Sequence, residues 1–157
     1  MSARLQPASS RIEPMREIDL GAVMRIENAA YGFPWSLGNF CDSLRSGYHG
    51  RLLLRDGDDA LLGYFVAMSG VDEMHLLNIT VAPEHQRQGH ALRLLQALCE
   101  LCRDCGAAQL WLEVRVSNER ARQLYERFGF GRVGMRRAYY PAAGGQREDA
   151  LVMSMEL

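Results

Sequence analysis

The sequence predicts an α/β fold of three layers, in which helices cover both faces of a central mixed sheet. Two kinds of hydrophobic periodicity predict it. Where apolar residues alternate with polar ones or run without interruption, we expect strands, and where they recur at helical spacing, we expect helices. Read in this way, the chain follows the order strand, helix, helix, three strands, helix, strand, helix, two strands. Its length of 157 residues suits one domain with a substantial core.

The first half of the chain supplies one strand, two helices and three consecutive strands. Asp19 and Ser36 are residue types that cap helix N-termini, and Gly47 is placed to end the second helix. An Asp-Gly pair at Asp56 and Gly57 is typical of a hairpin turn between two strands. The expected segments are a strand at 11–16, a helix at 20–31, a helix between Ser36 and Gly47, and strands at 51–55, 60–68 and 74–81.

The second half supplies two helices and three strands. In the strand expected at 109–116, Leu and Val residues alternate with Trp111, Glu113 and Arg115, which therefore share the opposite face. Asn118 is expected to cap the helix that follows, and Gly129 to end it. The expected segments are helices at 90–104 and 119–128, strands at 109–116, 131–140 and 150–157, and a loop at 141–149.

Composition excludes several functional classes. The chain has a formal net charge of -1, which argues against direct capture of nucleic acid or of an anionic membrane. All 18 basic residues other than histidine are arginine, so mechanisms that need a lysine, such as a Walker loop or a Schiff base, are excluded. No apolar run reaches the roughly 20 residues of a membrane span.

The N-terminus lacks the apolar segment of a secretory signal. We expect residues 1–10 to form a disordered leader and residues 11–157 to form a single domain. The expected location is the cytoplasm, and the expected state is a monomer.

The four cysteines raise the question of a metal site, because three of them follow the spacing C-x-x-C-x-x-C. Helical periodicity places Cys99 and Cys102 on the apolar face of the helix at 90–104, where a free cysteine acts as a small hydrophobic residue. A closed metal site needs four ligands, and the sequence offers no evident partner to complete one with these cysteines. We therefore expect no bound metal.

The stretch "QRQGHA" at residues 86–91 lies between an expected strand and an expected helix. Unpaired N–H groups at a helix N-terminus, together with Gly89, indicate a cradle for an anion. Neither a dinucleotide fingerprint nor a phosphate-binding loop with a Gly-Lys pair fits this stretch. A glycine-containing turn without a ligand is the alternative.

The motif of Gln86, Gly89 and Ala91 resembles the Q/R-x-x-G-x-G/A pattern of the GNAT family of N-acetyltransferases, whose fold has the derived order of elements. The blocks "FPWS", "LLNITVAPEHQRQG", "LWLEVRVSN", "LYERFGF", "RRAYYP" and "REDA" resemble the bacterial branch of ribosomal-protein alanine N-acetyltransferases, RimI-like proteins. The resemblance extends from about residue 12 to residue 155.

This resemblance implies that the anion is the pyrophosphate of acetyl-CoA. It implies that the strand before the cradle pairs with the pantetheine arm and that Asn118 contacts the cofactor, although Asn118 could equally serve only as a helix cap. The cofactor contacts implied are Ile79, Thr80, Val81, Arg87, Gln88, Gly89, His90, Ala91, Leu92 and Asn118.

The resemblance also assigns the two chemical roles. Glu113 would take a proton from the acceptor amine, directly or through water, whereas the residue pattern alone is equally consistent with an edge or ion-paired carboxylate. Tyr125 would protonate the leaving thiolate, whereas helical spacing alone favours a core aromatic residue. A backbone N–H near Val81 would hold the oxyanion.

The expected substrate is a protein N-terminus, specifically the N-terminal alanine of small-subunit ribosomal protein eighteen. Neutralising an α-amino group at pH 7 costs about 3 kcal/mol less than neutralising a lysine side chain. Trp35 and Tyr139 are candidate peptide contacts, with core or hairpin aromatics as the alternative. The loop around Gln146 is one residue longer than is usual in this branch, which leaves the peptide specificity open. The alternatives are a protein lysine or small-amine acetyltransferase and a non-catalytic acyl-CoA-binding module.

Overall fold

The computed structural model describes residues 9–157. Residues 1–8 of the expected leader lie outside the described residues. Within the described range the chain forms one seven-stranded sheet in the order β1-β2-β3-β4-β5-β7-β6. The elements are β1 (Ser10–Pro14), α1 (Leu20–Ala30), α2 (Leu37–Arg45), β2 (His49–Arg55), β3 (Leu61–Ser69), β4 (Glu73–Val81), α3 (His90–Asp104), β5 (Gln109–Arg115), α4 (Glu119–Phe128), β6 (Gly131–Pro141) and β7 (Arg147–Glu156).

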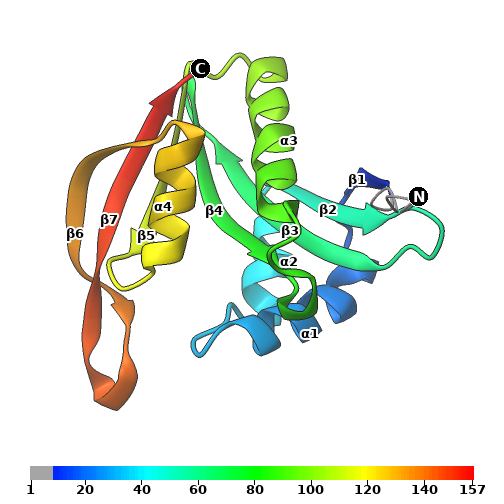
Figure 1. Cartoon of the computed structure of the whole chain (residues 1–157), viewed down its shortest axis with the longest axis horizontal. Helices are drawn as coiled ribbons and strands as arrows, with labels where there is room; N and C mark the ends of the chain where they lie inside the picture. Colours follow the sequence, from blue (N-terminus) through cyan, green and yellow to red (C-terminus); the bar gives the residue numbers. More distant parts are fainter. Residues whose placement is uncertain (1–8) are drawn as a thin grey trace, which may run out of the picture.

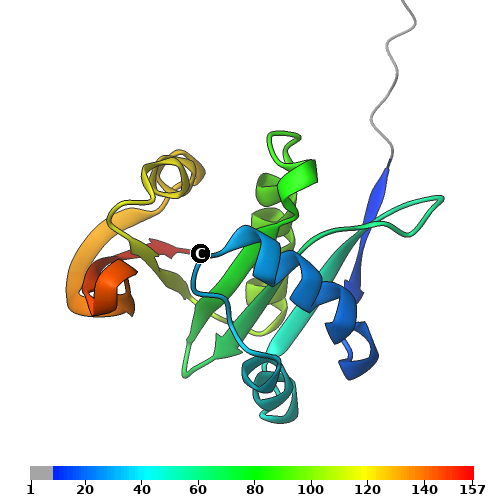
Figure 2. The ribbon, with the colours of Figure 1, turned by 90° about the horizontal axis from the view of Figure 1, so that it is seen from below.

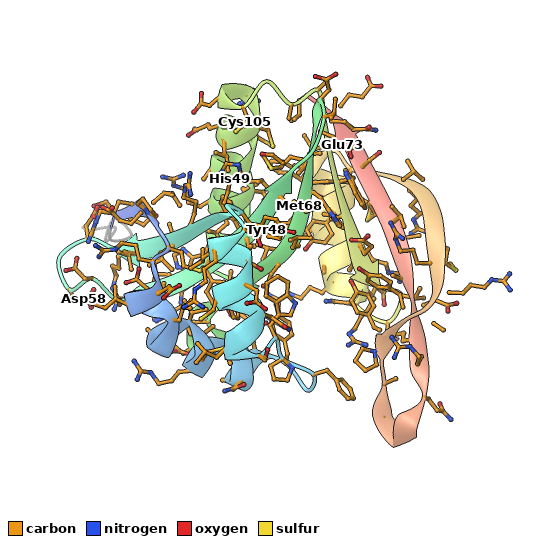
Figure 3. The ribbon with its side chains drawn as sticks, turned by 180° about the vertical axis from the view of Figure 1, so that it is seen from behind. Tyr48, His49, Asp58, Met68, Glu73 and Cys105 are labelled. Carbon is orange, nitrogen blue, oxygen red and sulfur yellow. The ribbon has the colours of Figure 1, made fainter. Side chains whose placement is uncertain are left out.

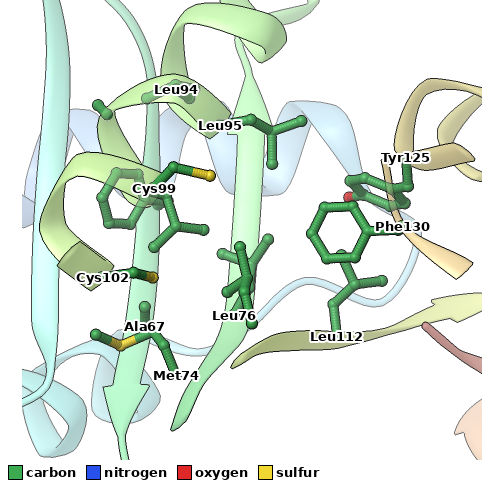
Figure 4. Close-up of a cluster of buried hydrophobic side chains, with 14 of the residues drawn as sticks. Ala67, Met74, Leu76, Leu94, Leu95, Cys99, Cys102, Leu112, Tyr125 and Phe130 are labelled. Carbon is green, nitrogen blue, oxygen red and sulfur yellow. The ribbon is translucent and has the colours of Figure 1, made fainter. Parts of the chain in front are cut away.

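Helices cover both faces of the sheet, as Figures 1 and 2 show, so the expected three layers and the expected order of elements are confirmed. The alternation of β3 explains the two faces. Phe65 and Ala67 point to the core under α3 and α4 (Figure 4), while Tyr64 and Val66 point to a second core under α1 and α2. None of the helices within residues 9–157 is long and apolar enough to cross a membrane.

Several details differ from the expectation, among them the end of β1 at Pro14 rather than at residue 16 and the start of β2 at His49 rather than at residue 51. Asp19 does not cap α1 with its side chain; its carboxylate accepts a hydrogen bond from the Arg16 N–H at 2.8 Å across a short 3-10 turn. The last strand begins at Arg147 rather than at residue 150, because the turn closes at Gly144 and Gly145, whose positive φ angles of 70° and 73° reverse the chain within a few residues. The helix at 90–104 and the cap of α2 by Ser36 are confirmed.

Strands β4 and β5 diverge after a short parallel pairing. Their paired residues run only from Glu73 with Gln109 to Leu76 with Leu112. Beyond this point β4 stays paired with β3, and β5 with β7, so the two strands separate toward their C-terminal ends (Figure 1). A register shift between Val66 and Ala67 of β3 marks a bulge in β4 just where the divergence starts.

Gly63 allows β3 and β4 to approach closely at the end of β4. A Cβ atom at this position would lie 2.5 Å from the Thr80 carbonyl oxygen and 3.2 Å from the Val81 Cα. The backbone of β3 at Gly63 therefore packs so closely against the end of β4 that no side chain fits at this position.

A buried polar network joins α1 to the same segment of β4. Glu27 is 1% exposed, and its carboxylate accepts hydrogen bonds from the Tyr64 hydroxyl at 2.8 Å and the Asn78 amide at 2.9 Å. Asn78 accepts in turn from the Thr80 hydroxyl at 2.8 Å. Burial raises the pKa of Glu27, although the bonds from Tyr64 and Asn78 oppose this.

We predict that Gly63→Ala destabilises the fold. The added methyl group would meet backbone atoms that cannot rotate away, so the free energy of unfolding should fall by about 1–3 kcal/mol. Urea denaturation would measure this. Gly21→Ala is the matched control, because a Cβ there meets nothing within 4 Å in helix α1 and should be neutral or stabilising. Equal stability of Gly63→Ala and wild type would contradict the close approach.

We predict a pH-dependent difference between wild type and Glu27→Gln. Because the folded-state pKa of Glu27 is raised above the ordinary value of 4.5, ionising this group costs stability. The stability of wild type relative to the variant should therefore be greatest below pH 4.5, decrease as the pH rises through the raised pKa, and then level off. Each tenfold increase in the proton affinity of this carboxylate on folding corresponds to about 1.4 kcal/mol. Urea denaturation of both proteins across this range would measure it, and a constant difference would show that Glu27 is not perturbed.

Candidate functional site

A cavity of about 520 Å³ lies beside the end of β4, beyond the last residue that β4 pairs with β5. It is bounded by the end of α1, the end of β4, the loop before α3, the first turn of α3 and one face of α4. It brings together most of the residues that the sequence predicted. These are Ile79, Thr80, Val81, Arg87, Gly89, His90, Ala91, Leu92, Asn118 and Tyr125.

Gln88 is the predicted cofactor contact that does not line this cavity. Its side-chain oxygen lies 3.2 Å from His90 Nε2. Any contribution of Gln88 to the cradle therefore comes from its backbone N–H.

The loop before α3 has the backbone geometry of an anion cradle. Gly89 occupies the N-cap position with φ 82° and ψ 9°, and Arg87 also has a positive φ, 62°. No side chain caps this helix, and within residues 9–157 the N–H groups of Arg87, Gln88 and Gly89 have no hydrogen-bond acceptor. Successive free N–H groups at a helix N-terminus form an anion-binding nest.

The charges around the cradle favour a polyanion. Arg87, Arg120 and Arg127 line the cavity, and no Asp or Glu is among its lining residues within the described chain. The whole chain carries a net charge of -1, so this positive region is local. Cradle and charge together fit a diphosphate group.

Tyr125 projects from α4 into the wall of the cavity. The residue is 8% exposed and its ring meets Phe130 edge-on at 5.6 Å. Its spacing therefore does place it in the core, as periodicity alone suggested, while its hydroxyl has no protein hydrogen-bond partner in the described structure. Burial raises the pKa of Tyr125, and Tyr31 and Tyr140 raise it further, so the hydroxyl keeps its proton at neutral pH.

Asn118 is the helix cap and also lies at the edge of the cavity. Its side-chain oxygen accepts a hydrogen bond from the Ala121 N–H at 3.2 Å, which confirms the helix cap. The residue also lines the cavity, so it is available to a ligand.

Glu113 lies one residue beyond the last pair between β4 and β5, outside the residues that line the cavity. Its side chain is 5% exposed and is held from two sides, by His75 Nε2 at 2.6 Å and by Arg136 Nε at 3.1 Å. His75 is itself fixed by stacking on Trp111, with ring centroids 3.6 Å apart. The ion-paired carboxylate that the residue pattern allowed is thus present.

His75 and Arg136 are functional candidates that the sequence did not reveal. They contact Glu113 from β4 and β6, and nothing in the spacing along the chain connects those strands with β5. Only the parallel register, in which His75 lies opposite Trp111, brings the imidazole and the carboxylate to one face of the sheet.

Electrostatic influences on tyrosine pKa values relate Glu113 to the cavity wall. After burial, the charge of Glu113 is the largest influence that raises the pKa of Tyr140, and Tyr140 in turn influences the pKa of Tyr125. Tyr31 approaches from the end of α1: its hydroxyl lies 3.1 Å from the Ile79 carbonyl oxygen and 2.7 Å from Thr80 Oγ1. Tyr31 and Tyr125 share the wall of the cavity, and the influences on pKa connect this wall with Glu113 through Tyr140.

Arg115 contacts segments that are far apart along the chain. Its guanidinium donates to the Pro141 carbonyl at 2.8 Å and to Glu148 at 3.2 Å. The same group lies 4.5 Å from the ring of Tyr140 and 5.6 Å from the ring of Phe33. It thus links the loop between α1 and α2 to the β6-β7 hairpin.

The two candidate peptide contacts lie on these same segments. Trp35 is half-buried against Phe40, with ring centroids 5.0 Å apart, and its backbone N–H donates to Glu27 at 3.4 Å. Tyr139 is 41% exposed on β6, beside Arg136 and Tyr140. Neither lines the cavity, and Tyr139 is the more accessible of the two.

The cysteines form no cluster with the usual metal ligands. Cys99 and Cys102 are buried on the core face of α3 (Figure 4), and the exposed Cys105 lies 3.9 Å from His49 at the C-terminal end of the same helix (Figure 3). Within residues 9–157 no group of three or more His, Cys, Asp or Glu side chains is arranged to hold a metal ion.

Known proteins resemble this chain over most of its length. It is 39% identical over 146 residues to the ribosomal protein bS18-alanine N-acetyltransferase of Escherichia coli, covering 93% of this chain and 97% of the relative. The enzyme of the same name from Haemophilus ducreyi is 36% identical, with 93% and 99% covered.

Solved structures agree. The crystal structure of the bS18-alanine N-acetyltransferase from Escherichia coli superposes with a TM-score of 0.85 at 38% identity, covering 94% of each chain. Ard1 from Thermoplasma volcanium, at 22% identity, shares the fold with a TM-score of 0.82 over 94% of this chain and 97% of its own. The model of the acetyltransferase (GNAT) family matches residues 20–130. The chain is a member of the GNAT family of acetyltransferases.

Proposed function

We propose that this protein transfers the acetyl group of acetyl-CoA to the N-terminal α-amino group of a protein, most specifically the N-terminal alanine of ribosomal protein bS18. The observation that carries the proposal is the lysine-free cationic cradle, with Arg87, Arg120 and Arg127 around free N–H groups, which opens onto Tyr125. The two bacterial relatives with 39% and 36% identity are named for this substrate.

The cradle would hold the diphosphate of acetyl-CoA through the N–H groups at residues 87–92. Because these donors are backbone groups, His90 and Ala91 are tolerated as well as any other side chains at their positions. The end of β4 at residues 79–81 lacks a partner strand on the β5 side and can pair with the extended pantetheine arm. Acetyl-CoA supplies the activated acetyl group as a thioester.

Three protein groups would then serve the transfer. Glu113 accepts the proton that the amine must lose, directly or through a water molecule. A backbone N–H near Val81 stabilises the negative charge on the carbonyl oxygen. Tyr125 donates its proton to the departing sulfur, which its raised pKa permits because the hydroxyl remains protonated.

The proton balance supports an N-terminal amine as acceptor. Reaching the neutral form at pH 7 costs about 3 kcal/mol less for an α-amino group than for a lysine side chain. The proposed mechanism has one carboxylate, held by His75 and Arg136, as its only base, and this suits the easier deprotonation. The proposal includes a monomeric enzyme that acts in the cytoplasm, where ribosomal proteins are made.

We expect the purified protein to acetylate a peptide that carries the N-terminal sequence of bS18 with a kcat/KM at least about tenfold above that for lysine peptides or polyamines. Mass spectrometry and thiol release would measure transfer. A peptide with a blocked N-terminus and an internal lysine is the matched control. Preferential acetylation of the blocked peptide would refute the N-terminal assignment, and a protein that binds acetyl-CoA without transfer to any amine would be a binding module.

We expect Glu113→Gln and Tyr125→Phe to lower kcat by about two to four orders of magnitude, the usual contribution of a general acid or base. Acetyl-CoA affinity, measured by calorimetry, should stay close to that of wild type, because neither side chain belongs to the diphosphate cradle. Glu126→Gln is a control on the exposed side of α4. Unchanged kcat in both variants would refute the assigned roles.

A further inference from the structure

We propose that Tyr31 binds the amino group of the acceptor as a hydrogen-bond acceptor, and that the buried carboxylate of Glu27 fixes the hydroxyl in this orientation through Asn78 and Thr80. This inference rests on the proposed function and adds to it the residue that receives the amine. It concerns a buried polar network beside the cavity that the chemistry above does not use.

The direction of each hydrogen bond in this network follows from the carboxylate of Glu27 at its buried end. A carboxylate can only accept, so Asn78 must turn its NH₂ group to Glu27 at 2.9 Å and its oxygen to Thr80. The Thr80 hydroxyl donates its single proton to the Asn78 side-chain oxygen. It can therefore only accept from Tyr31, whose hydroxyl lies 2.7 Å away.

The hydroxyl proton of Tyr31 is used in a hydrogen bond within the protein, whichever of two acceptors it binds. Its possible partners are Thr80 Oγ1 at 2.7 Å and the Ile79 carbonyl oxygen at 3.1 Å, and both accept. Burial raises the pKa of Tyr31 to about 12, so the hydroxyl stays protonated at neutral pH. Its remaining lone pair is therefore the group it can offer to a ligand, and it selects a ligand with an N–H or O–H donor.

The position of Tyr31 indicates that the N–H group bound by its hydroxyl belongs to the substrate amine that receives the acetyl group. The residue is 40% exposed and lines the cavity at the end of α1, beside Ile79 and Thr80 where β4 leaves β5. It is also close enough to Tyr125 to influence its pKa. A group here lies at the end of β4, where the proposed reaction brings the amine to the acetyl group, whereas the diphosphate cradle lies in the loop before α3. A primary amine brings more N–H donors than the chemistry consumes.

Glu27 is in this account a positioning residue. It lies 1% exposed on α1 and receives bonds from Tyr64, Asn78 and the Trp35 N–H. If Glu27 only stabilised the fold, the hydrogen bonds from Asn78 to Thr80 and from Thr80 to Tyr31 could run in either direction. A carboxylate imposes one, because it cannot donate.

The test is the steady-state kinetics of Tyr31→Phe with the bS18 peptide. Losing one hydrogen bond to a charged or polar amine should raise the KM for the peptide about tenfold or more. The kcat should change less than about threefold, and acetyl-CoA affinity should stay at the wild-type value. An unchanged peptide KM would overturn the proposal, as would a loss of acetyl-CoA affinity, which would place the hydroxyl on the cofactor.

The role of Glu27 is tested by a double-mutant cycle. Glu27→Gln should raise the peptide KM, and the double variant Glu27→Gln/Tyr31→Phe should be no worse than Tyr31→Phe alone, because both changes remove one interaction. Additive increases would show that Glu27 acts only on stability and would overturn its positioning role.

Tyr48→Phe is the matched control. Tyr48 is a half-buried tyrosine before β2, labelled in Figure 3, and it does not line the cavity. Its KM for the peptide should equal that of wild type. Failure of the wild-type protein to acetylate any N-terminal peptide would refute the proposed function itself, whereas activity with an unchanged KM in Tyr31→Phe refutes only the inference on Tyr31.

Discussion

The separation of β4 from β5 after Leu76 and Leu112 is the constraint on which the site depends. A parallel pair that continued to its ends would satisfy the backbone of residues 79–81 with β5 and leave nothing for a ligand. The separation leaves that backbone without a partner strand on the β5 side, and the first turn of α3, the face of α4 and the end of α1 surround the cavity beside it. Gly63 and the network of Glu27 hold the freed part of β4 from its other side.

Local signals were sufficient for most of the fold. The helical spacing of the apolar residues in α3 and α4 and the alternation in β5 predicted those elements to within a residue of their bounds. The start of β7 was wrong by three residues, because Arg147 and Glu148 look like loop residues until their pairing with Pro141 and Tyr140 is known. The side chain of Asp19 bonds back across a 3-10 turn, which a capping preference does not distinguish from a cap.

Some residues of the candidate site could likewise be predicted from the sequence, and others could not. The cradle was predicted because its residues are close together in sequence, whereas the role of Tyr125 came from the resemblance to the GNAT family, since its helical spacing alone favours a core residue. His75, Arg136, Tyr31 and Glu27 were not, because each meets the site through a contact between elements far apart along the chain. Polar residues of this kind carry no periodic signal, and only the register of the sheet shows which of them meet.

The cations around the cavity are all guanidinium groups, contributed by Arg87, Arg120 and Arg127. A guanidinium stays charged across the physiological pH range, so the attraction for a diphosphate would not weaken in mildly alkaline conditions. It also lacks the nucleophilic neutral amine that a lysine can form. A pocket built in this way could hold a reactive thioester without presenting any amine of its own to it, so the acetyl group would be protected from transfer to the protein that binds it.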